Sequence, residues 1–176
     1  MTGMLLKNEL HAQILPAQTA NLADILQKKG WLMATAESCT GGMIAAACTD
    51  LAGSSAWFER GFVTYSNAAK TEMLGVDPLL IEQHGAVSEP VALAMAQGAL
   101  ARSHAQVAVA VTGVAGPGGG SAGKPVGMVW LGWATLAGVT SEVRNFGGDR
   151  AAVRQATVAY AIARLIDLLN LPTAPA

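Results

Sequence analysis

A nearly continuous apolar run, Gln106–Thr112, is the feature that most limits how this chain can fold. Its centre, Val107–Val111, alternates valine with alanine and has no polar residue to face water on either side. Runs of this kind are typical of strands that helices cover on both faces of a sheet. The run therefore predicts a buried strand inside an α/β fold.

The rest of the chain alternates strands with helices before it ends in a hairpin and a long helix. Strands are expected at 31–36, 57–65, 106–112, 126–135 and 139–146, and helices at 14–29, 43–48, 67–74, 78–84, 88–101 and 150–169. The short turn Leu136–Gly138 predicts the hairpin, so one strand runs antiparallel to its neighbour. We expect a three-layer α/β/α sandwich with a mixed, mostly parallel sheet, as one domain over residues 1–176 with a core of about 15–169.

Composition narrows the function classes. Hydrophobic residues make up 52% and charged residues 13% of the 176 residues, which predicts a buried subunit interface and hence a homo-oligomer, with a dimer favoured. A net charge of -1 without a basic cluster argues against nucleic-acid or membrane-surface binding. Neither the cysteines, Cys39 and Cys48, nor the histidines form a metal-ligand cluster. No signal peptide or membrane helix is evident, so we expect a cytoplasmic protein.

The stretch Ala34–Gly42 has the pattern of a strand, a tight polar turn and the start of a helix. Such a turn places side chains at the carboxyl end of a sheet, beside free backbone N–H groups that favour negative charge. Ser38, Cys39 and Thr40 are candidate nucleophiles there, and Gly41 and Gly42 allow a ligand to approach the backbone. An ordinary helix N-cap explains the same residue types equally well.

The glycine-rich loop Gly118–Pro125 resembles two phosphate-binding motifs but satisfies neither. Pro125 stands where a P-loop needs Ser or Thr, and the following segment is an expected strand, whereas both the P-loop and the dinucleotide GxGxxG motif require a helix. We therefore exclude an ATPase and a Rossmann site. The loop is either a phosphate cradle formed by backbone N–H groups or a plain flexible connection.

Two kinds of basic residue remain as candidates. Lys70 lies four residues after Ser66 on an expected helix, so the pair lacks the spacing of the penicillin-binding Ser/Lys motif, and Ser66 is expected to cap the helix. Lys70 is otherwise typical of a solvated helix residue. A phosphate partner is expected among four arginines, of which Arg150 is best placed at a helix start: Arg60, Arg144, Arg150 and Arg154.

Five segments in this order resemble one family. They are Thr35–Gly42, Gly53–Asn67 followed by Lys70, His84–Pro90, Thr112–Pro117 followed by Lys124–Gly127, and Gly148–Arg150. Together they resemble the nicotinamide-nucleotide amidohydrolases, which are stand-alone relatives of the C-terminal domain of the competence-damage-inducible CinA proteins. The resemblance spans roughly Leu22–Leu168, and we expect the single-domain form of the family.

The resemblance implies deamidation of nicotinamide mononucleotide to nicotinate mononucleotide and ammonia, without a metal or organic cofactor. It implies that Ser38 is the nucleophile and Lys70 the base, with Tyr65 orienting Lys70 or relaying a proton. Backbone N–H groups of Thr40, Gly41 and Gly42 would bind the oxyanion. The remaining expected substrate-binding residues lie at or beyond the ends of three different expected strands: Asn67, Thr112, Gly113, Gly116 and Arg150.

Two other functions stay open at this point. The chain could be a nucleotide-binding or partner-binding module without turnover, or an amidase for a different small carboxamide. The sequence does not give the distance between Ser38 and Lys70, because residues this far apart in the chain are brought together only by the fold.

Overall fold

The computed structural model describes residues 2–171, with side chains from residue 14 onward. Every expected helix and strand is present, and their ends differ from expectation by one or two residues except at the start of the first helix. A short 3-10 helix, η1 (Ser54–Ala56), was not expected. The helices are α1 (Thr2–Lys29), α2 (Met43–Thr49), α3 (Asn67–Leu74), α4 (Pro78–His84), α5 (Glu89–Ala101) and α6 (Arg150–Asn170), and the strands are β1 (Met33–Glu37), β2 (Phe58–Val63), β3 (Val107–Gly113), β4 (Met128–Thr135) and β5 (Gly138–Asn145).

The five strands form one sheet in the order β2-β1-β3-β4-β5. β1 pairs in parallel with β2 and β3, while β4 is antiparallel to both β3 and β5, so β4 alone runs against the other four. In the β4–β5 hairpin, Thr135 pairs with Gly138 across a two-residue loop. The expected mixed, mostly parallel sheet is confirmed.

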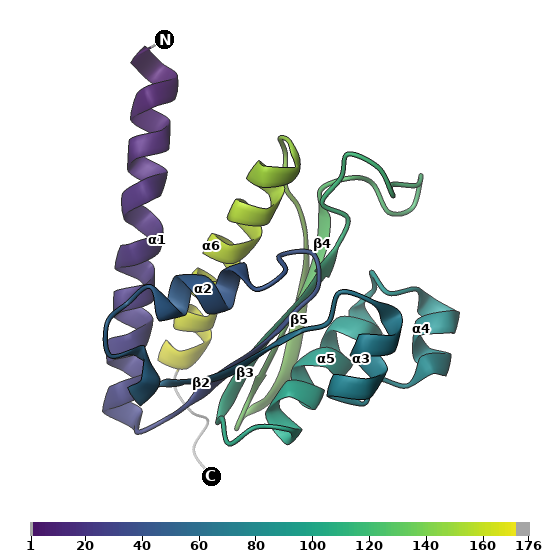
Figure 1. The fold of residues 1–176 in the computed structure, drawn as a ribbon, viewed down its shortest axis with the longest axis horizontal. Coiled ribbons are helices and arrows are strands. Elements are labelled where there is room, and N and C mark those ends of the chain that lie inside the picture. Colours follow the sequence, from purple (N-terminus) through teal and green to yellow (C-terminus); the bar gives the residue numbers. More distant parts are fainter. Residues whose placement is uncertain (1, 172–176) are drawn as a thin grey trace.

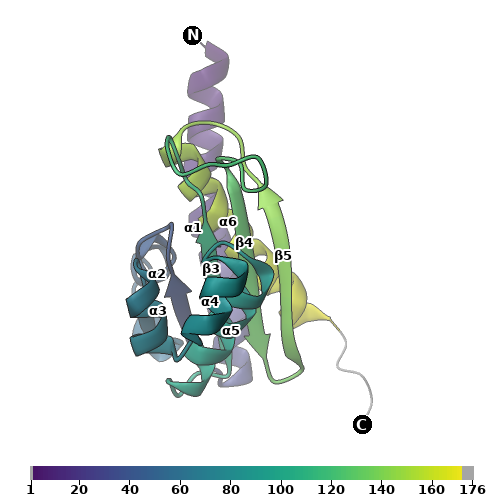
Figure 2. The same cartoon turned by 90° about the vertical axis from the view of Figure 1, so that its right-hand side faces the viewer.

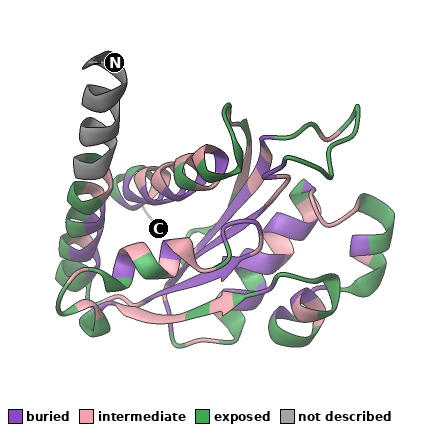
Figure 3. Ribbon diagram, turned by 45° about the horizontal axis from the view of Figure 1, so that its top comes forward, coloured by how far each residue is buried: buried purple, intermediate pink, exposed green. Residues whose placement is uncertain are grey.

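Helices cover both faces of this sheet, which gives three layers. Figure 1 shows α1, α2 and α6 on one side and α3, α4 and α5 on the other, and Figure 2 shows the hairpin strand β5 at the sheet edge. Each face has its own hydrophobic cluster. Buried residues gather in the strands and on the inward sides of the helices (Figure 3). The sheet core therefore holds the strand ends in fixed positions.

Valine and alanine alternate along β3, so the two faces of the sheet present side chains of different size to the two helical layers. Its valines, including Val109, belong to the cluster under α1, α2 and α6, whereas Ala108 and Ala110 face α5. Small residues on this side let α5 approach the sheet closely. A Cβ added at Gly132 would lie 2.6 Å from the carbonyl oxygen of Ala92 in α5.

The surface keeps several large apolar side chains exposed, among them Val63, Tyr65 and Leu79. Such residues are compatible with the expected homo-oligomer, which stays a prediction. Across residues 2–171, no helix combines the length and the apolar character needed to cross a bilayer.

Candidate active site

The carboxyl ends of the neighbouring strands β1 and β2 lie at a point where the chain leaves the sheet toward opposite faces. After β1 the chain continues into α2 on one face, and after β2 it continues into α3 on the opposite face. In open α/β sheets, ligands bind outside the carboxyl ends of the strands at such a point. Because β1 and β2 are parallel neighbours, Ser38 after β1 and Thr64 after β2 lie at the same edge. The backbone N–H of Thr64 donates to the carbonyl oxygen of Glu37, which holds the two strand ends together.

Lys70 and Ser38 are in direct contact at these strand ends. The Nζ atom of Lys70 lies 3.0 Å from Ser38 Oγ and also donates to the carbonyl oxygen of Thr64 at 3.0 Å. Lys70 is only 2% exposed although it lies on a short surface helix. Burial lowers the pKa of Lys70 below its ordinary value, because the apolar surroundings disfavour the ammonium form. The solvated-lysine interpretation is therefore wrong, and the amine is suited to accept a proton from Ser38.

The three candidate nucleophiles of the turn differ sharply in their surroundings. Burial raises the pKa of the Cys39 thiol to about 11, so this thiol stays protonated at neutral pH. The Thr40 hydroxyl is fully buried and donates to Glu37 Oε2 at 2.6 Å. Ser38 is half-buried, and its hydroxyl contacts the Lys70 amine. The geometry therefore favours Ser38 over both neighbours.

The buried carboxylate of Glu37 organises the backbone of the turn. It accepts hydrogen bonds from the N–H groups of Gly42 (3.1 Å), Ile44 (3.0 Å) and Ala45 (2.8 Å), and thus occupies the N-terminus of α2. The Gly41 N–H donates to the Ser38 carbonyl oxygen at 3.0 Å. Two of the three expected oxyanion donors, those of Gly41 and Gly42, are therefore already used within the protein. Within residues 14–171, no backbone or side-chain acceptor takes up the Thr40 N–H.

Tyr65 differs from its expected position. Its hydroxyl oxygen accepts a hydrogen bond from Arg150 Nη2 at 2.6 Å, and the side chain is 58% exposed. Its ring lies near Gly41, where an added Cβ would be 3.8 Å away. Arg150 also donates to the carbonyl oxygen of Gly116 at 2.9 Å. Tyr65 and Gly116, from two different loops, thus meet at the start of α6, and among the described residues the hydroxyl of Tyr65 is hydrogen-bonded to Arg150.

Residues at the end of β3 are more involved in packing than expected. The hydroxyl of Thr112 is buried and donates to the carbonyl oxygen of Ala86 at 2.8 Å, so it is not free for a ligand. A Cβ added at Gly113 would lie 2.6 Å from the side chain of Val129, which explains glycine there by close packing against β4. Gly116 has a φ of +81° and presents its carbonyl oxygen to Arg150.

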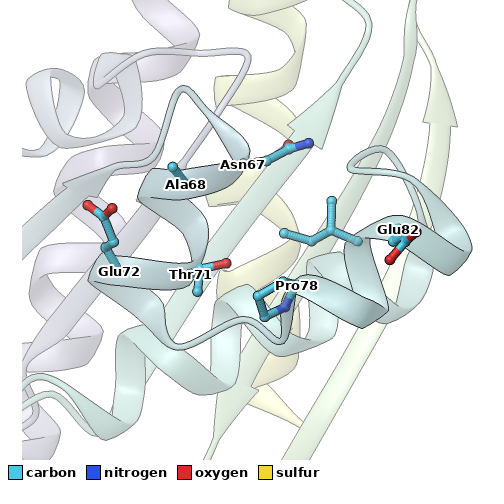
Figure 4. A pocket seen from close by; sticks show the side chains of 7 residues that line it. Asn67, Ala68, Thr71, Glu72, Pro78 and Glu82 are labelled. Carbon is cyan, nitrogen blue, oxygen red and sulfur yellow. The ribbon is translucent and has the colours of Figure 1, made fainter.

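Asn67 lines a separate pocket of about 440 Å³ between α3 and α4. Figure 4 shows it with other lining residues, Thr71 and Glu72 on α3 and Pro78 and Glu82 on α4. The structure therefore brings Asn67 to this pocket, and its expected role in substrate binding stays a prediction. The expected cap is confirmed next to it, since Ser66 Oγ accepts the N–H of Ala69 at 3.0 Å.

Comparisons with known proteins identify the family of this chain. The family model described as the CinA C-terminal domain matches residues 16–169. The chain belongs to the CinA C-terminal domain family. It is 58% identical to the nicotinamide-nucleotide amidohydrolase PncC of Enterobacter agglomerans over 78% of this chain and 84% of that protein. The corresponding protein of Pseudomonas putida is 57% identical over 86% of this chain and 93% of the relative.

Longer CinA-family proteins and solved structures also match this CinA-family chain. The CinA-like protein of Akkermansia muciniphila is 56% identical over 76% of this chain, which corresponds to 33% of that longer protein. The crystal structure of the competence/damage inducible protein CihA from Agrobacterium tumefaciens superposes with a TM-score of 0.87 and 49% identity, over 90% of this chain and 96% of that one. The expected family and the α/β fold are therefore confirmed.

Sequence reasoning missed two side chains of this site. Glu37 lies inside the segment Ala34–Gly42, but the sequence predicted no role for it. Arg154 was expected only as one of four candidate phosphate partners. Arg154 donates to the carbonyl oxygens of Cys39 and Thr40 at 3.2 and 2.9 Å. Its position four residues after Arg150 on α6, which places both on one helix face, was the available signal. Among the described residues, no group of three or more His, Cys, Asp and Glu side chains gathers as a metal site would require.

Proposed function

We propose that this chain hydrolyses the carboxamide of nicotinamide mononucleotide to nicotinate mononucleotide and ammonia. The observation that carries the proposal is the 3.0 Å contact between Lys70 Nζ and Ser38 Oγ at the carboxyl ends of β1 and β2. The names of the amidohydrolase relatives, which cover most of this chain, support the same reaction and substrate.

The first step of the proposed reaction is proton transfer from Ser38 to Lys70. A buried, neutral amine is a competent general base, and the depressed pKa of Lys70 keeps more of it neutral at working pH. The carbonyl oxygen of Thr64 accepts one N–H of this amine and so helps to turn its lone pair toward Ser38. Ser38 Oγ then attacks the carboxamide carbon to form a tetrahedral oxyanion.

The oxyanion is held by the Thr40 N–H in this proposal, since the N–H groups of Gly41 and Gly42 have internal acceptors. One such donor is typically worth about 3 kcal/mol in the transition state. The intermediate collapses as protonated Lys70 delivers its proton to the departing nitrogen, so ammonia leaves and an ester on Ser38 remains. Lys70 then removes a proton from a water molecule, which hydrolyses the ester and restores the Ser38 hydroxyl.

Arg150 is our candidate for binding the substrate phosphate. Its guanidinium is exposed, and its hydrogen bonds within residues 14–171 go to the Tyr65 hydroxyl and the Gly116 carbonyl oxygen. By contrast, Arg60 and Arg144 are each paired with a carboxylate, Glu59 and Glu142 respectively. A guanidinium with neutral partners is better able to exchange them for a phosphate. Tyr65 and Gly116 would then form the neighbouring wall of the phosphate site.

The proposal is tested by measuring ammonia release from nicotinamide mononucleotide. We expect Ser38→Ala and Lys70→Ala to lose activity by about 10³-fold or more, because the two act as a unit. The matched control is Ser66→Ala, which removes a cap worth about 1 kcal/mol of stability but leaves the chemistry intact.

Two results would contradict the proposed reaction. Wild-type protein that binds the mononucleotide without releasing ammonia would be a binding module. Equal turnover of the mononucleotide and of nicotinamide riboside would argue against phosphate recognition and favour another small carboxamide as the substrate.

A further inference from the structure

The guanidinium of Arg154, on α6, donates hydrogen bonds to the backbone of the turn Ser38–Gly42, which we call the nucleophile turn. Nε donates to the carbonyl oxygen of Cys39 at 3.2 Å, and Nη2 donates to that of Thr40 at 2.9 Å. Arg154 is half-buried, and a Cβ added at Gly41 would lie 3.6 Å from Nη2. Arg164, further along the same helix, instead pairs with the carboxylate of Glu142 at 2.6 Å. Arg154 therefore directs its charge at two peptide carbonyls, and these directly follow Ser38 in the chain.

Because each peptide unit is planar, fixing the direction of its carbonyl also fixes the direction of its N–H. The peptides of the turn are trans, and in a trans peptide the C=O and the following N–H point in opposite directions. Holding the Cys39 carbonyl toward Arg154 therefore turns the Thr40 N–H away from it. Holding the Thr40 carbonyl likewise fixes the Gly41 N–H, which closes the turn onto the Ser38 carbonyl oxygen at 3.0 Å.

The charge of Arg154 also strengthens the donor that it orients. A guanidinium at a carbonyl oxygen draws electron density through the peptide and makes the attached N–H a stronger hydrogen-bond donor, as in charge-assisted and chained hydrogen bonds. On the other side of the turn, the Glu37 carboxylate binds the N–H groups of Gly42, Ile44 and Ala45. The peptide dipoles of the turn thus lie between a fixed positive and a fixed negative charge.

We propose that Arg154 is a positioning residue that aims and polarises the Thr40 N–H toward the oxyanion formed at Ser38. This inference rests on the proposed function for the identity of the substrate, but not for the reactivity of Ser38. Arg154 acts through the backbone and does not touch the substrate. Its loss therefore weakens transition-state binding more than it weakens substrate binding.

The test compares kcat and KM for ammonia release from nicotinamide mononucleotide in Arg154→Ala, Arg154→Lys and the control Arg164→Ala. We expect kcat of Arg154→Ala to fall by about 10²-fold while KM changes by less than about 3-fold. Millimolar guanidinium should restore part of the lost kcat, because it can occupy the vacated space beside the two carbonyls. The kcat of Arg154→Lys should lie between those of wild type and Arg154→Ala, since an ammonium lacks the planar fork that reaches both carbonyl oxygens. Arg164→Ala should keep kcat and show no rescue.

Several outcomes would overturn this role for Arg154. An unchanged kcat in Arg154→Ala, a rise of KM alone, or a loss that guanidinium does not rescue in a folded variant would each do so. If Arg154→Ala does not fold, wild-type kcat in Arg154→Lys would overturn the role, and a reduced kcat at unchanged KM would support it.

A second measurement separates this inference from the proposed substrate. A fluorophosphonate probe labels an activated serine by forming an Oγ–P bond and releasing fluoride and the serine proton. We expect Arg154→Ala to slow the labelling of Ser38 and guanidinium to restore it, whatever carboxamide is the natural substrate. If wild-type protein releases no ammonia from the mononucleotide, the proposed function fails, while the labelling rates still decide the role of Arg154.

Discussion

Replacing the buried carboxylate of Glu37 tests how the turn Ser38–Gly42 is stabilised. In Glu37→Gln the amide oxygen can take the place of Oε2, which accepts hydrogen bonds from Thr40 Oγ1 and from the N–H groups of Gly42 and Ile44. The amide nitrogen must then face the N–H of Ala45, which now bonds Oε1 at 2.8 Å. One charge-assisted hydrogen bond is lost and two donors oppose each other in a buried site, at a cost of about 3 kcal/mol.

Part of that cost is offset, because the neutral amide no longer requires a charge to be buried. We therefore expect the free energy of unfolding of Glu37→Gln to fall by about 2 kcal/mol, which leaves the fold intact. Glu37→Ala leaves all four donors without their acceptor and should cost about 5 kcal/mol.

Urea unfolding measures these differences, with ammonia release as a second readout. The control is Glu89→Gln, an exposed carboxylate whose bond from Ser141 an amide oxygen can keep, with an expected change below about 0.5 kcal/mol. The reasoning is refuted if Glu37→Gln unfolds at the same urea concentration as this control.

Four further predictions concern the buried residues Lys70 and Gly98. Lys70→Met should abolish ammonia release but raise the stability at neutral pH by about 1 kcal/mol, because it removes a buried amine; a lower melting temperature would contradict this. Burial lowers the pKa of Lys70 in the folded state, so the unfolded chain binds more protons between that lowered pKa and 10.5. The free energy of unfolding of wild type should therefore rise toward that of Lys70→Met as the pH rises through this range. Urea unfolding in which the difference between the two proteins grows with pH would count against this. For the same reason kcat/KM should rise with pH through the lowered pKa of Lys70, and a profile whose rise begins only near 10.5 would show that the amine is not perturbed. Gly98→Ala should destabilise the fold by about 2 kcal/mol or more in thermal melts, because its Cβ would lie 2.2 Å from the carbonyl oxygen of Leu74, and a melt equal to wild type would mean that α5 shifts freely.

The sequence was sufficient wherever a local rule decides the structure. Ser66 and Asp149 each accept a backbone N–H as N-caps, as expected of their residue types at helix starts. The valine and alanine alternation of residues 107–111 predicted a strand with two covered faces, and each face carries its own cluster. Helix and strand ends depend on residues close together in the chain, so they can be predicted without knowledge of the tertiary structure.

Contacts between distant residues were decided only by the tertiary structure. Ser38 and Lys70 meet because β1 and β2 are parallel neighbours whose following segments start at the same edge of the sheet. Tyr65 was expected beside Lys70 but contacts Arg150, which lies 85 residues away in the chain. Arg154 reaches the turn across 114 residues to Thr40. Sequence alone thus determined the elements, the family and the candidate chemistry, because residue type and local spacing carry those signals. The contact between Lys70 and Ser38, and the side chains that hold the turn after Ser38, were decided by packing, because burial and hydrogen-bond partners exist only once the layers have come together.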